Sequence, residues 1–347
     1  MSVNLKEVIS ELCSIPGPAG FEEKVALRVK ELFEPYMDEV SIDVLGNVIG
    51  VKRCGIDNAK KLLFDAHIDE IGFVVTGVEE GFLRFSKLGG FDARVVPATG
   101  VTICTDPPLF GVISVLPPHI LKKEDTDNNF KLEDLFIDTG LDCDKAKELI
   151  KPGTHGVAAC GVKDFGKNQI CGKAIDDRAG VAAILKSLEL LKDKKLNVDI
   201  YIMASVQEEV GSRGATAGAF TIAPDYSVVI DVDHVKTPDT KPSETTMEIG
   251  AGVIITRGPN MNNVFTEKVI TLAKENDIKY QLNVKAGSNS GTNARAIQIS
   301  QTGSATALLG LPMKYMHSAN EVASLSDIEC AAALLAKTAE SFNKEVK

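Results

Sequence analysis

Two stretches near the start of the chain carry apolar residues at the spacing of an amphipathic helix. In NLKEVISELCSI, residues 4–15, the apolar positions that share one helical face are Leu5, Val8, Ile9 and Leu12. In FEEKVALRVKELFEPYM, residues 21–37, the same spacing predicts a second helix that ends at Pro35 or shortly after. The glycine- and proline-rich PGPAG separates the two predicted helices.

The next stretch of the chain has the patterns of β-strands. VSIDVLGNVIGVKR predicts a hairpin with its turn at Gly46 and Asn47, and KKLLFDAHIDEIGFVVTGV, residues 60–78, follows it, with His67 and Asp69 expected on a strand. From about residue 73 to about residue 162, β-branched segments such as FVVTGV, FLRFSKL and LFGVISVLP are short and separated by glycine or proline. This texture predicts a small all-β barrel or sandwich, which one acidic helix, DCDKAKELIK, interrupts near its end.

After residue 163 the pattern changes to apolar strands that alternate with amphipathic helices. A helix over about 179–191 is followed by the strands VDIYIMASV and YSVVIDVDH, the helix NNVFTEKVITLAKEN, the strands KYQLNV and ATALLGLP, and a terminal helix over 324–344. Such alternation predicts an α/β fold with a mixed, mostly parallel sheet between helices. We therefore expect one discontinuous α/β domain, 1–72 and 163–347, with an inserted β-rich domain, 73–162.

Composition narrows the class of protein. The net charge of -10 disfavours nucleic acid as a partner. The seven cysteines form no CxxC pair, which favours free thiols in a reducing compartment. The first residues lack the apolar core of a signal peptide, and no apolar run has the roughly 20 residues that span a bilayer. We expect a cytoplasmic protein that does not associate with membranes.

Acidic and histidine residues gather where the apolar segments end. The segments with their residues are LLFDAHIDEIGF (His67, Asp69), GKAIDDRAG (Asp176, Asp177), IYIMASVQEEVGSRG (Glu208, Glu209), YSVVIDVDH (Asp231, Asp233, His234) and LGLPMKYMHSANEV (His317, Glu321). Open α/β sheets bind ligands beyond the carboxyl ends of their strands. Each residue alone is more often a cap or a solvated side chain, and Asp177 beside Arg178 has an ion pair as its simple alternative. The joint occurrence predicts one site.

The residue types point to metal chemistry. Histidine and carboxylate ligands without thiolate suit Zn²⁺ or Co²⁺, and two histidines with several acids exceed what one tetrahedral ion needs. Two ions that share a bridging carboxylate polarise a carbonyl and lower the pKa of a water molecule. A free carboxylate must then move the proton of that water.

In HID, the i, i+2 spacing on a strand places Asp69 on the same face as His67, where it can fix the imidazole tautomer. On a strand, the adjacent Glu208 and Glu209 diverge, so we expect them to differ in role.

Five ordered segments, DAHIDEIGF, AIDDRAG, QEEVGSRGA, VVIDVDH and KYMHSANEV, with PGPAGFEEKV and the β-rich insertion, resemble a family of di-metal aminopeptidases. That family includes glutamyl aminopeptidase and the self-assembling tetrahedral aminopeptidases, and some members carry the label endo-1,4-glucanase. The resemblance implies a hydrolase that removes N-terminal residues from short peptides. It also implies two divalent ions, Zn or Co, a homo-oligomer such as a dodecamer, and a role for the insertion in oligomerisation and access.

The resemblance also implies a role for each site residue. His67 and Asp231 would bind one ion, Asp176 would bridge both, Glu209 and His317 would bind the second, Glu208 would be the general base, and Asp69 would orient His67. The chain departs from the pattern at Asn293, Asp233 and Ala319, where relatives often carry aspartate, a small polar residue and proline. The first two departures bear on how a substrate amine is held. Arg257 and Arg295 are further loop cations, each either a specificity residue or simply solvated or paired.

Two alternatives to an aminopeptidase follow from the same residues. A di-metal amidase or deacylase of N-acyl substrates keeps both ions and changes only the substrate. An endo-1,4-glucanase needs two carboxyls roughly 5–9.5 Å apart across a sugar, and it usually offers aromatic platforms. The adjacent Glu208 and Glu209 and the absence of Trp disfavour the glucanase. Because the general base is present, a non-catalytic metal-binding protein is disfavoured as well.

Overall fold

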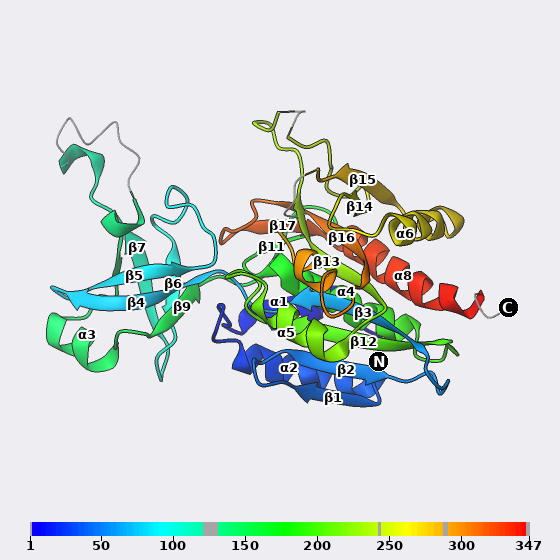
Figure 1. Ribbon diagram of the computed structural model, residues 1–347. Coiled ribbons are helices and arrows are strands. Elements are labelled where there is room, and N and C mark those ends of the chain that lie inside the picture. The colour runs from blue at the N-terminus through cyan, green and yellow to red at the C-terminus, as the bar shows by residue number, and fades with distance from the viewer. Residues whose placement is uncertain (1, 121–130, 242–243, 287–290, 345–347) are drawn as a thin grey trace.

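The structure is a computed structural model that describes residues 2–120, 131–241, 244–286 and 291–344. It has a larger part built on one long sheet and, beside it, a small β-barrel (Figure 1). The chain enters the barrel directly after the central strand β3 (Lys60–His67) and returns to the large sheet at β10 (Lys163–Asp164). Among the described helices, none is both long and apolar enough to cross a membrane.

The predicted helices are present, and the structure adds two that the apolar pattern does not predict, Arg213–Ile222 and Ala294–Ile297. The α-helices are α1 (Leu5–Ser14), α2 (Glu23–Phe33), α3 (Cys143–Leu149), α4 (Ile175–Leu190), α5 (Arg213–Ile222), α6 (Asn263–Glu275), α7 (Ala294–Ile297) and α8 (Leu325–Ser341). Short 3₁₀ helices cover Glu34–Tyr36, Pro118–Ile120, Leu132–Asp134 and Phe342–Lys344. α4 is assigned from Ile175, but Asp176 and Asp177 have non-helical backbone angles, so its regular turns begin close to the predicted residue 179.

The large sheet is mixed, with parallel strands at its centre and antiparallel strands on its flanks. Its strands are β1 (Glu39–Ile42), β2 (Val48–Lys52), β3, β10, β11 (Gln169–Gly172), β12 (Val198–Ser205), β13 (Tyr226–His234), β14 (Val253–Arg257), β15 (Tyr280–Val284), β16 (Ala305–Lys314) and β17 (Glu321–Ser324). Their order is β1-β2-β12-β3-β13-β16-β17-β11-β10, with β14 and β15 beside β16. The run β12-β3-β13-β16 is parallel.

The flanking strands account for the departures from the predicted sheet. The hairpin predicted at Gly46 and Asn47 is confirmed as β1 and β2, which pair antiparallel. The strands β11, β14 and β17 are not predicted by the sequence pattern, and each pairs antiparallel with a neighbour. Parallel pairing is therefore less extensive than the alternation of strands and helices indicates, because strands that pair antiparallel need no helical crossover.

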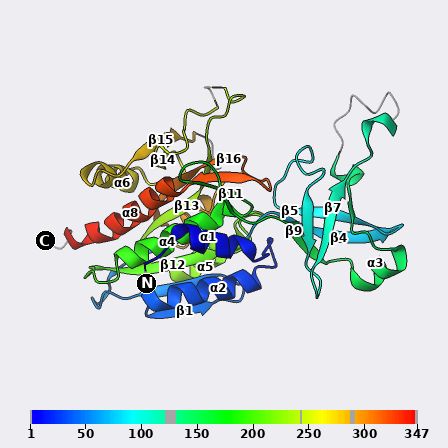
Figure 2. The same ribbon diagram turned by 180° about the vertical axis from the view of Figure 1, so that it is seen from behind.

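Helices cover the sheet on both faces, as the alternation predicts. The face seen in Figure 2 is covered by α1 and α4, and its core joins the apolar sides of α1, α2, α4, α6 and α8 to the sheet. The other face, seen in Figure 1, is covered by α5, and its smaller core joins α5 and α7 to the sheet. Successive residues of β3 divide between the faces, with Leu62 and Phe64 in the larger core and Leu63 in the smaller.

The inserted segment forms a barrel with its own core. Its strands are β4 (Gly72–Glu79), β5 (Phe82–Leu88), β6 (Gly100–Ile103), β7 (Leu109–Ser114), β8 (Phe136–Asp138) and β9 (His155–Ala158). They close in the order β4-β5-β8-β7-β6-β9, so between the predicted barrel and sandwich the structure is a barrel. The side chains of Phe73, Leu83, Ile103 and Ile137 are buried inside it. The helix predicted in DCDKAKELIK is present as α3.

A buried ion cluster ties the first helix to the start of α4. Lys173 donates to both carboxylate oxygens of Glu70, at 2.9 and 2.7 Å, and Arg178 donates to one of them at 3.2 Å. The other guanidinium donors reach the main-chain oxygens of Leu12, Ile15 and Ile68. All three charged side chains are buried, so Glu70 is the counter-charge for both cations.

Removing that counter-charge is expected to destabilise the fold strongly. In Glu70→Ala two buried cations lose their carboxylate, which costs about 3–5 kcal/mol in the free energy of unfolding when a buried pair is broken. The control is Glu148→Ala, which removes the exposed partner of Lys145 and is expected to cost under about 1 kcal/mol. Urea unfolding of both variants measures the difference. Equal losses would contradict the assigned role of Glu70.

Candidate metal centre

The predicted site residues come from separate parts of the chain and meet at the carboxyl end of the parallel strands. Their places are His67 at the last position of β3, Asp176 in the first turn of α4, Glu208 and Glu209 after β12, Asp231 in β13, and His317 between β16 and β17. Ser205, the last residue of β12, is directly opposite His67 in the parallel pairing. The strand ends thus bring together side chains that are up to 250 residues apart in the chain, from His67 to His317.

Asp176 lies between the two histidines. Its Oδ1 is 3.1 Å from Nε2 of His67, and its Oδ2 is 3.4 Å from Nε2 of His317. The same Nε2 of His317 is 3.2 Å from Oε1 of Glu209. The Asp176 carboxylate therefore faces a different imidazole with each oxygen, which is the arrangement that a ligand shared by two ions requires.

A second group of ligand atoms shares His67 with the first. His67, Asp177 and Asp231 each place one ligand atom within 4.8 Å of the others, as do His67, Asp176 and Glu209. Oδ2 of Asp177 accepts a hydrogen bond from the His67 amide at 3.3 Å, whereas its buried Oδ1 has no hydrogen-bond partner. The simple alternative of an ion pair with Arg178 is wrong, because that guanidinium is directed at Glu70.

The local electrostatics are those of crowded carboxylates. Burial is the main cause that raises the pKa of Asp177 and of Asp231 well above the usual range, and neighbouring carboxylates add to it. Burial opposes the charged form of His317, but hydrogen bonds to Asp176 and Glu209 outweigh it and raise its pKa to about 11. Burial also opposes ionisation of Asp176, yet the two imidazoles lower the pKa of this carboxyl below its usual range. The cluster thus has more carboxyl groups than its two imidazoles can balance if all of them ionise.

Glu208 and Glu209 stand in a loop and not at a strand end. β12 ends at Ser205, and Gln207 has a φ of 56°, a left-handed backbone conformation that is uncommon for a residue other than glycine. The expected divergence of two strand neighbours is therefore the wrong reason for their different directions, which this turn sets. Glu209 reaches His317, while Glu208 accepts from the Ser212 hydroxyl at 3.3 Å.

Asp69 holds both this loop and His67. Its Oδ1 and Oδ2 accept the main-chain amides of Glu208 and Glu209, at 3.0 and 3.1 Å. Nδ1 of His67 is 3.0 Å from the main-chain oxygen of Asp69 and 3.5 Å from its carboxylate. β3 ends at His67, so the expectation that both residues share a strand face does not apply. The carbonyl makes the closer contact to the imidazole.

The departures from the family pattern have local partners. Nδ2 of Asn293 donates to Oδ2 of Asp65 at 2.9 Å and to the Ser205 hydroxyl at 2.8 Å, both buried. Asp233 accepts from Asn283 at 2.8 Å and lies 3.3 Å from the ammonium of Lys285. Asp233 is therefore a paired acid.

Arg257 is paired as well, which is one of the two alternatives considered for this residue. Its guanidinium is 2.6 Å from the Glu267 carboxylate, and both side chains are exposed. The other loop cation, Arg295, is half-buried on α7.

Two further buried acids, Asp65 and Glu321, belong to the site, although the sequence predicted no role for either of them. Asp65 lies two residues before His67 in β3, and burial raises its pKa to about 7. Oε2 of Glu321 accepts the Asp176 amide at 3.1 Å. The acid in the apolar run LLFDAH is the signal that marks Asp65, whereas the contact of Glu321 depends on the way β17 returns beside β16.

The residues present fit a divalent-cation site. The donors are imidazole nitrogens and carboxylate oxygens, which suit Zn²⁺ or Co²⁺. Asp177 retains a buried oxygen without a hydrogen-bond partner, and burial with neighbouring negative charge disfavours ionised Asp231. Cations in this position would give the Asp177 oxygen a partner and would favour the ionised form of Asp231.

Comparison with known proteins identifies the family. Residues 46–334 match the sequence model of the M42 glutamyl aminopeptidases. A lysyl aminopeptidase of Pyrococcus furiosus is 32% identical over 331 residues, covering 93% of this chain and 93% of that protein.

Solved structures give the same answer. The TET aminopeptidase of a marine-sediment Thaumarchaeota archaeon has a TM-score of 0.92 and 32% identity, covering 97% of this chain and 96% of that one. A TET peptidase of Pyrococcus horikoshii, which assembles into a tetrahedron or a large octahedral shell, has a TM-score of 0.85 and 31% identity, with 97% and 99% covered. The chain therefore belongs to the M42 glutamyl aminopeptidase family and is a hydrolase of the aminopeptidase class.

Proposed function

We propose that the protein removes N-terminal residues from short peptides, using two divalent ions, Zn or Co, held at the carboxyl edge of the sheet. The observation that carries the proposal is the Asp176 carboxylate, whose oxygens lie 3.1 and 3.4 Å from Nε2 of His67 and of His317. In this proposal His67 and Asp231 hold one ion, Glu209 and His317 hold the other, and Asp176 bridges them. Asp177 lies close enough to His67 and Asp231 to support the first ion.

The protein side chains would divide the remaining work. Bound ions polarise the scissile carbonyl and lower the pKa of a water molecule. Glu208 would accept the proton of that water and pass it to the departing amine. Burial raises the pKa of the Glu208 carboxyl to about 7, which suits a group that gains and loses a proton near neutral pH. Asp69 would keep the His67 ring and the Glu208 main chain in place together.

The inserted barrel (73–162) is proposed to serve oligomerisation and access. Gly89, just after β5, has a φ of 80°, and a Cβ atom there would lie 3.1 Å from Oε2 of Glu209. A Cβ at the next residue, Gly90, would lie 3.4 Å from Nδ1 of His317. Barrel and site are thus in contact. By analogy with the Pyrococcus horikoshii relative, we propose a large homo-oligomer, such as a dodecamer, whose barrel shapes the entry of peptides. A cytoplasmic location stays a prediction.

The variants Glu208→Gln and Glu209→Gln are expected to distinguish the role of general base from the role of metal ligand. Glu208→Gln keeps both ions, but kcat falls about 100-fold or more because the proton acceptor is lost. Glu209→Gln loses close to one equivalent of metal. Metal analysis of the purified variants, together with turnover of an aminoacyl-nitroanilide, measures both effects. The reverse pattern would exchange the two roles.

The rate is expected to fall at low pH. Glu208 acts as the charged base, so protonation removes it, and kcat/KM decreases about tenfold per pH unit on the acid side. Burial raises the pKa of this carboxyl to about 7, and bound cations lower that pKa. The acid limb of the pH–rate profile therefore lies no higher than about pH 7. The residual activity of Glu208→Gln should lack this limb. A profile between pH 4 and 9 measures it, and an unchanged limb in the variant would assign it elsewhere.

A substrate panel with chelation distinguishes the alternatives. The aminopeptidase is expected to cleave aminoacyl-nitroanilides with a free amine, to spare their N-acetylated forms, and to lose activity in EDTA until Zn²⁺ or Co²⁺ is restored. Cleavage of only the acetylated set would establish the amidase or deacylase. Hydrolysis of a β-1,4-glucan that resists EDTA would establish a two-carboxyl glucanase.

A further inference from the structure

Successive main-chain amides of the loop that carries Glu208 and Glu209 are held by side chains from distant segments. The amide of Val206 donates to Oδ1 of Asn47 at 3.0 Å, and the amide of Gln207 donates to Oε1 of Glu22 at 3.0 Å. The next two amides, of Glu208 and Glu209, donate to the carboxylate of Asp69. Side-chain acceptors thus take the place of a β-partner along four consecutive residues, 206–209.

Among these side-chain acceptors, Glu22 is the one that neither the turn between β1 and β2 nor the proposed metal centre accounts for. It lies in PGPAGFEEKV at the N-cap position of α2, yet its side chain makes no capping hydrogen bond to that helix. Its Oε1 accepts instead from the amides of Gly20 and Gln207, at 2.8 and 3.0 Å. The side chain is 5% exposed, and burial raises the pKa of its carboxyl to about 7. The helix N-terminus lacks a side-chain acceptor, and the Glu22 carboxyl is buried. Each of these features lowers the stability of the fold locally.

The residue that Glu22 holds has a strained backbone conformation. Gln207 has a φ of 56°, and this left-handed turn separates the end of β12 from Glu208. Strained backbone of this kind persists only when surrounding contacts over-determine it. After the turn, the amides of Gly211 and Ser212 return to the Glu208 carbonyl at 2.8 and 3.0 Å. The loop is thus fixed on both sides of the two acids.

We propose that Glu22 is a positioning residue for the catalytic loop: by accepting the Gln207 amide it holds the turn that directs Glu208 and Glu209 to different tasks. In this proposal it acts through the main chain of the loop. The consequence for turnover rests on the proposed function, whereas the contact itself does not. A misplacement of about 1 Å at a reacting group costs on the order of 100-fold in rate.

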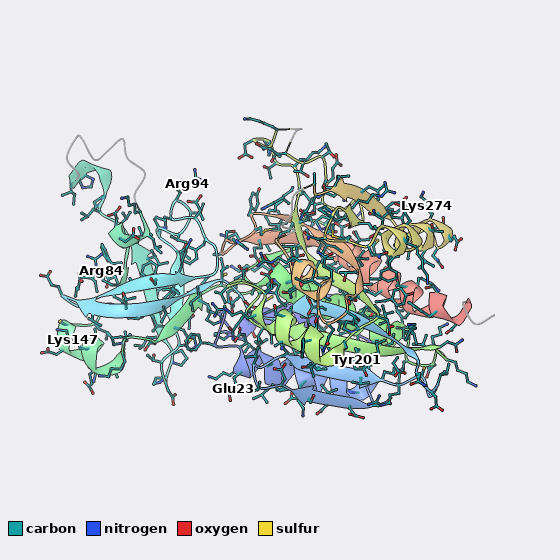
Figure 3. The ribbon with its side chains drawn as sticks, in the orientation of Figure 1. Glu23, Arg84, Arg94, Lys147, Tyr201 and Lys274 are labelled. Atoms are coloured by element: carbon teal, nitrogen blue, oxygen red, sulfur yellow. The ribbon has the colours of Figure 1, made fainter. Side chains whose placement is uncertain are left out.

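The test compares three variants of the full-length, metal-loaded protein. Glu22→Ala removes the acceptor, and Glu22→Gln keeps an oxygen acceptor without the charge. Glu23→Ala is the matched control, because Glu23 is the next residue and is exposed at the outer edge of the molecule (Figure 3). Amide hydrogen exchange of the peptide 204–215, metal content, and kcat and KM on an aminoacyl-nitroanilide are measured for each.

We expect Glu22→Ala to speed amide exchange at Gln207 to Glu209 at least tenfold and to lower kcat about 10- to 100-fold, with KM within threefold of the parent. Glu22→Gln should recover most of both effects, and Glu23→Ala should match the parent. A kcat for Glu22→Ala within twofold of the parent, or equal losses in Glu22→Ala and Glu23→Ala, would overturn the proposal. Failure of Glu22→Gln to recover exchange and kcat would do so as well.

A further variant and the exchange data keep the test decisive. If Glu22→Ala does not fold, Glu22→Asp replaces it: the shortened carboxylate cannot span both amides, and unchanged exchange and kcat would overturn the proposal. If the parent protein cleaves no peptide, the proposed function fails. Faster exchange in Glu22→Ala then still supports the clamp, and unchanged exchange rejects it.

Discussion

The mutual repulsion of buried carboxylates at one edge of the sheet is the constraint on which the rest of this structure depends. Charges of one sign, taken out of water and placed close together, are strongly unfavourable. Burial and neighbouring charge raise the pKa of Asp177 and Asp231 well above the usual range, while the two imidazoles lower that of Asp176. Such a cluster is unfavourable as a structural core and suitable as a cation site, and membership of a metal-dependent aminopeptidase family agrees with it.

The fold holds this edge with side-chain acceptors from distant parts of the chain. Asp69 and Glu22 accept main-chain amides of the loop after β12. Glu321 does the same for the amide of Asp176. Each contact satisfies a buried donor and an acceptor together, and each fixes one irregular segment relative to another. Side chains outside the metal ligands thus determine where the ligands stand.

Much of this could be predicted from the sequence, for physical reasons. The helices α1, α2 and α8 and the strands β3, β12, β13 and β16 carry apolar periodicity, because their burial depends on which face each residue presents. The sequence pattern does not predict the short strands β11 and β17, since strands of four residues bordered by turns leave little periodic signal. The residues His67, Asp176, Glu209, Asp231 and His317 are predicted by residue type and by position after apolar runs, and the structure brings them together.

The sequence by itself determined the class of fold, the membership of the family, and the set of acids and histidines that gather at one edge. Only the tertiary structure decided how these side chains are aimed. The left-handed turn at Gln207, the two amides held by Asp69 and the pairing of Asp233 with Lys285 depend on contacts between residues that are distant in the chain. Local pattern records which face of an element is buried, and it carries no information about which remote donor meets which acceptor.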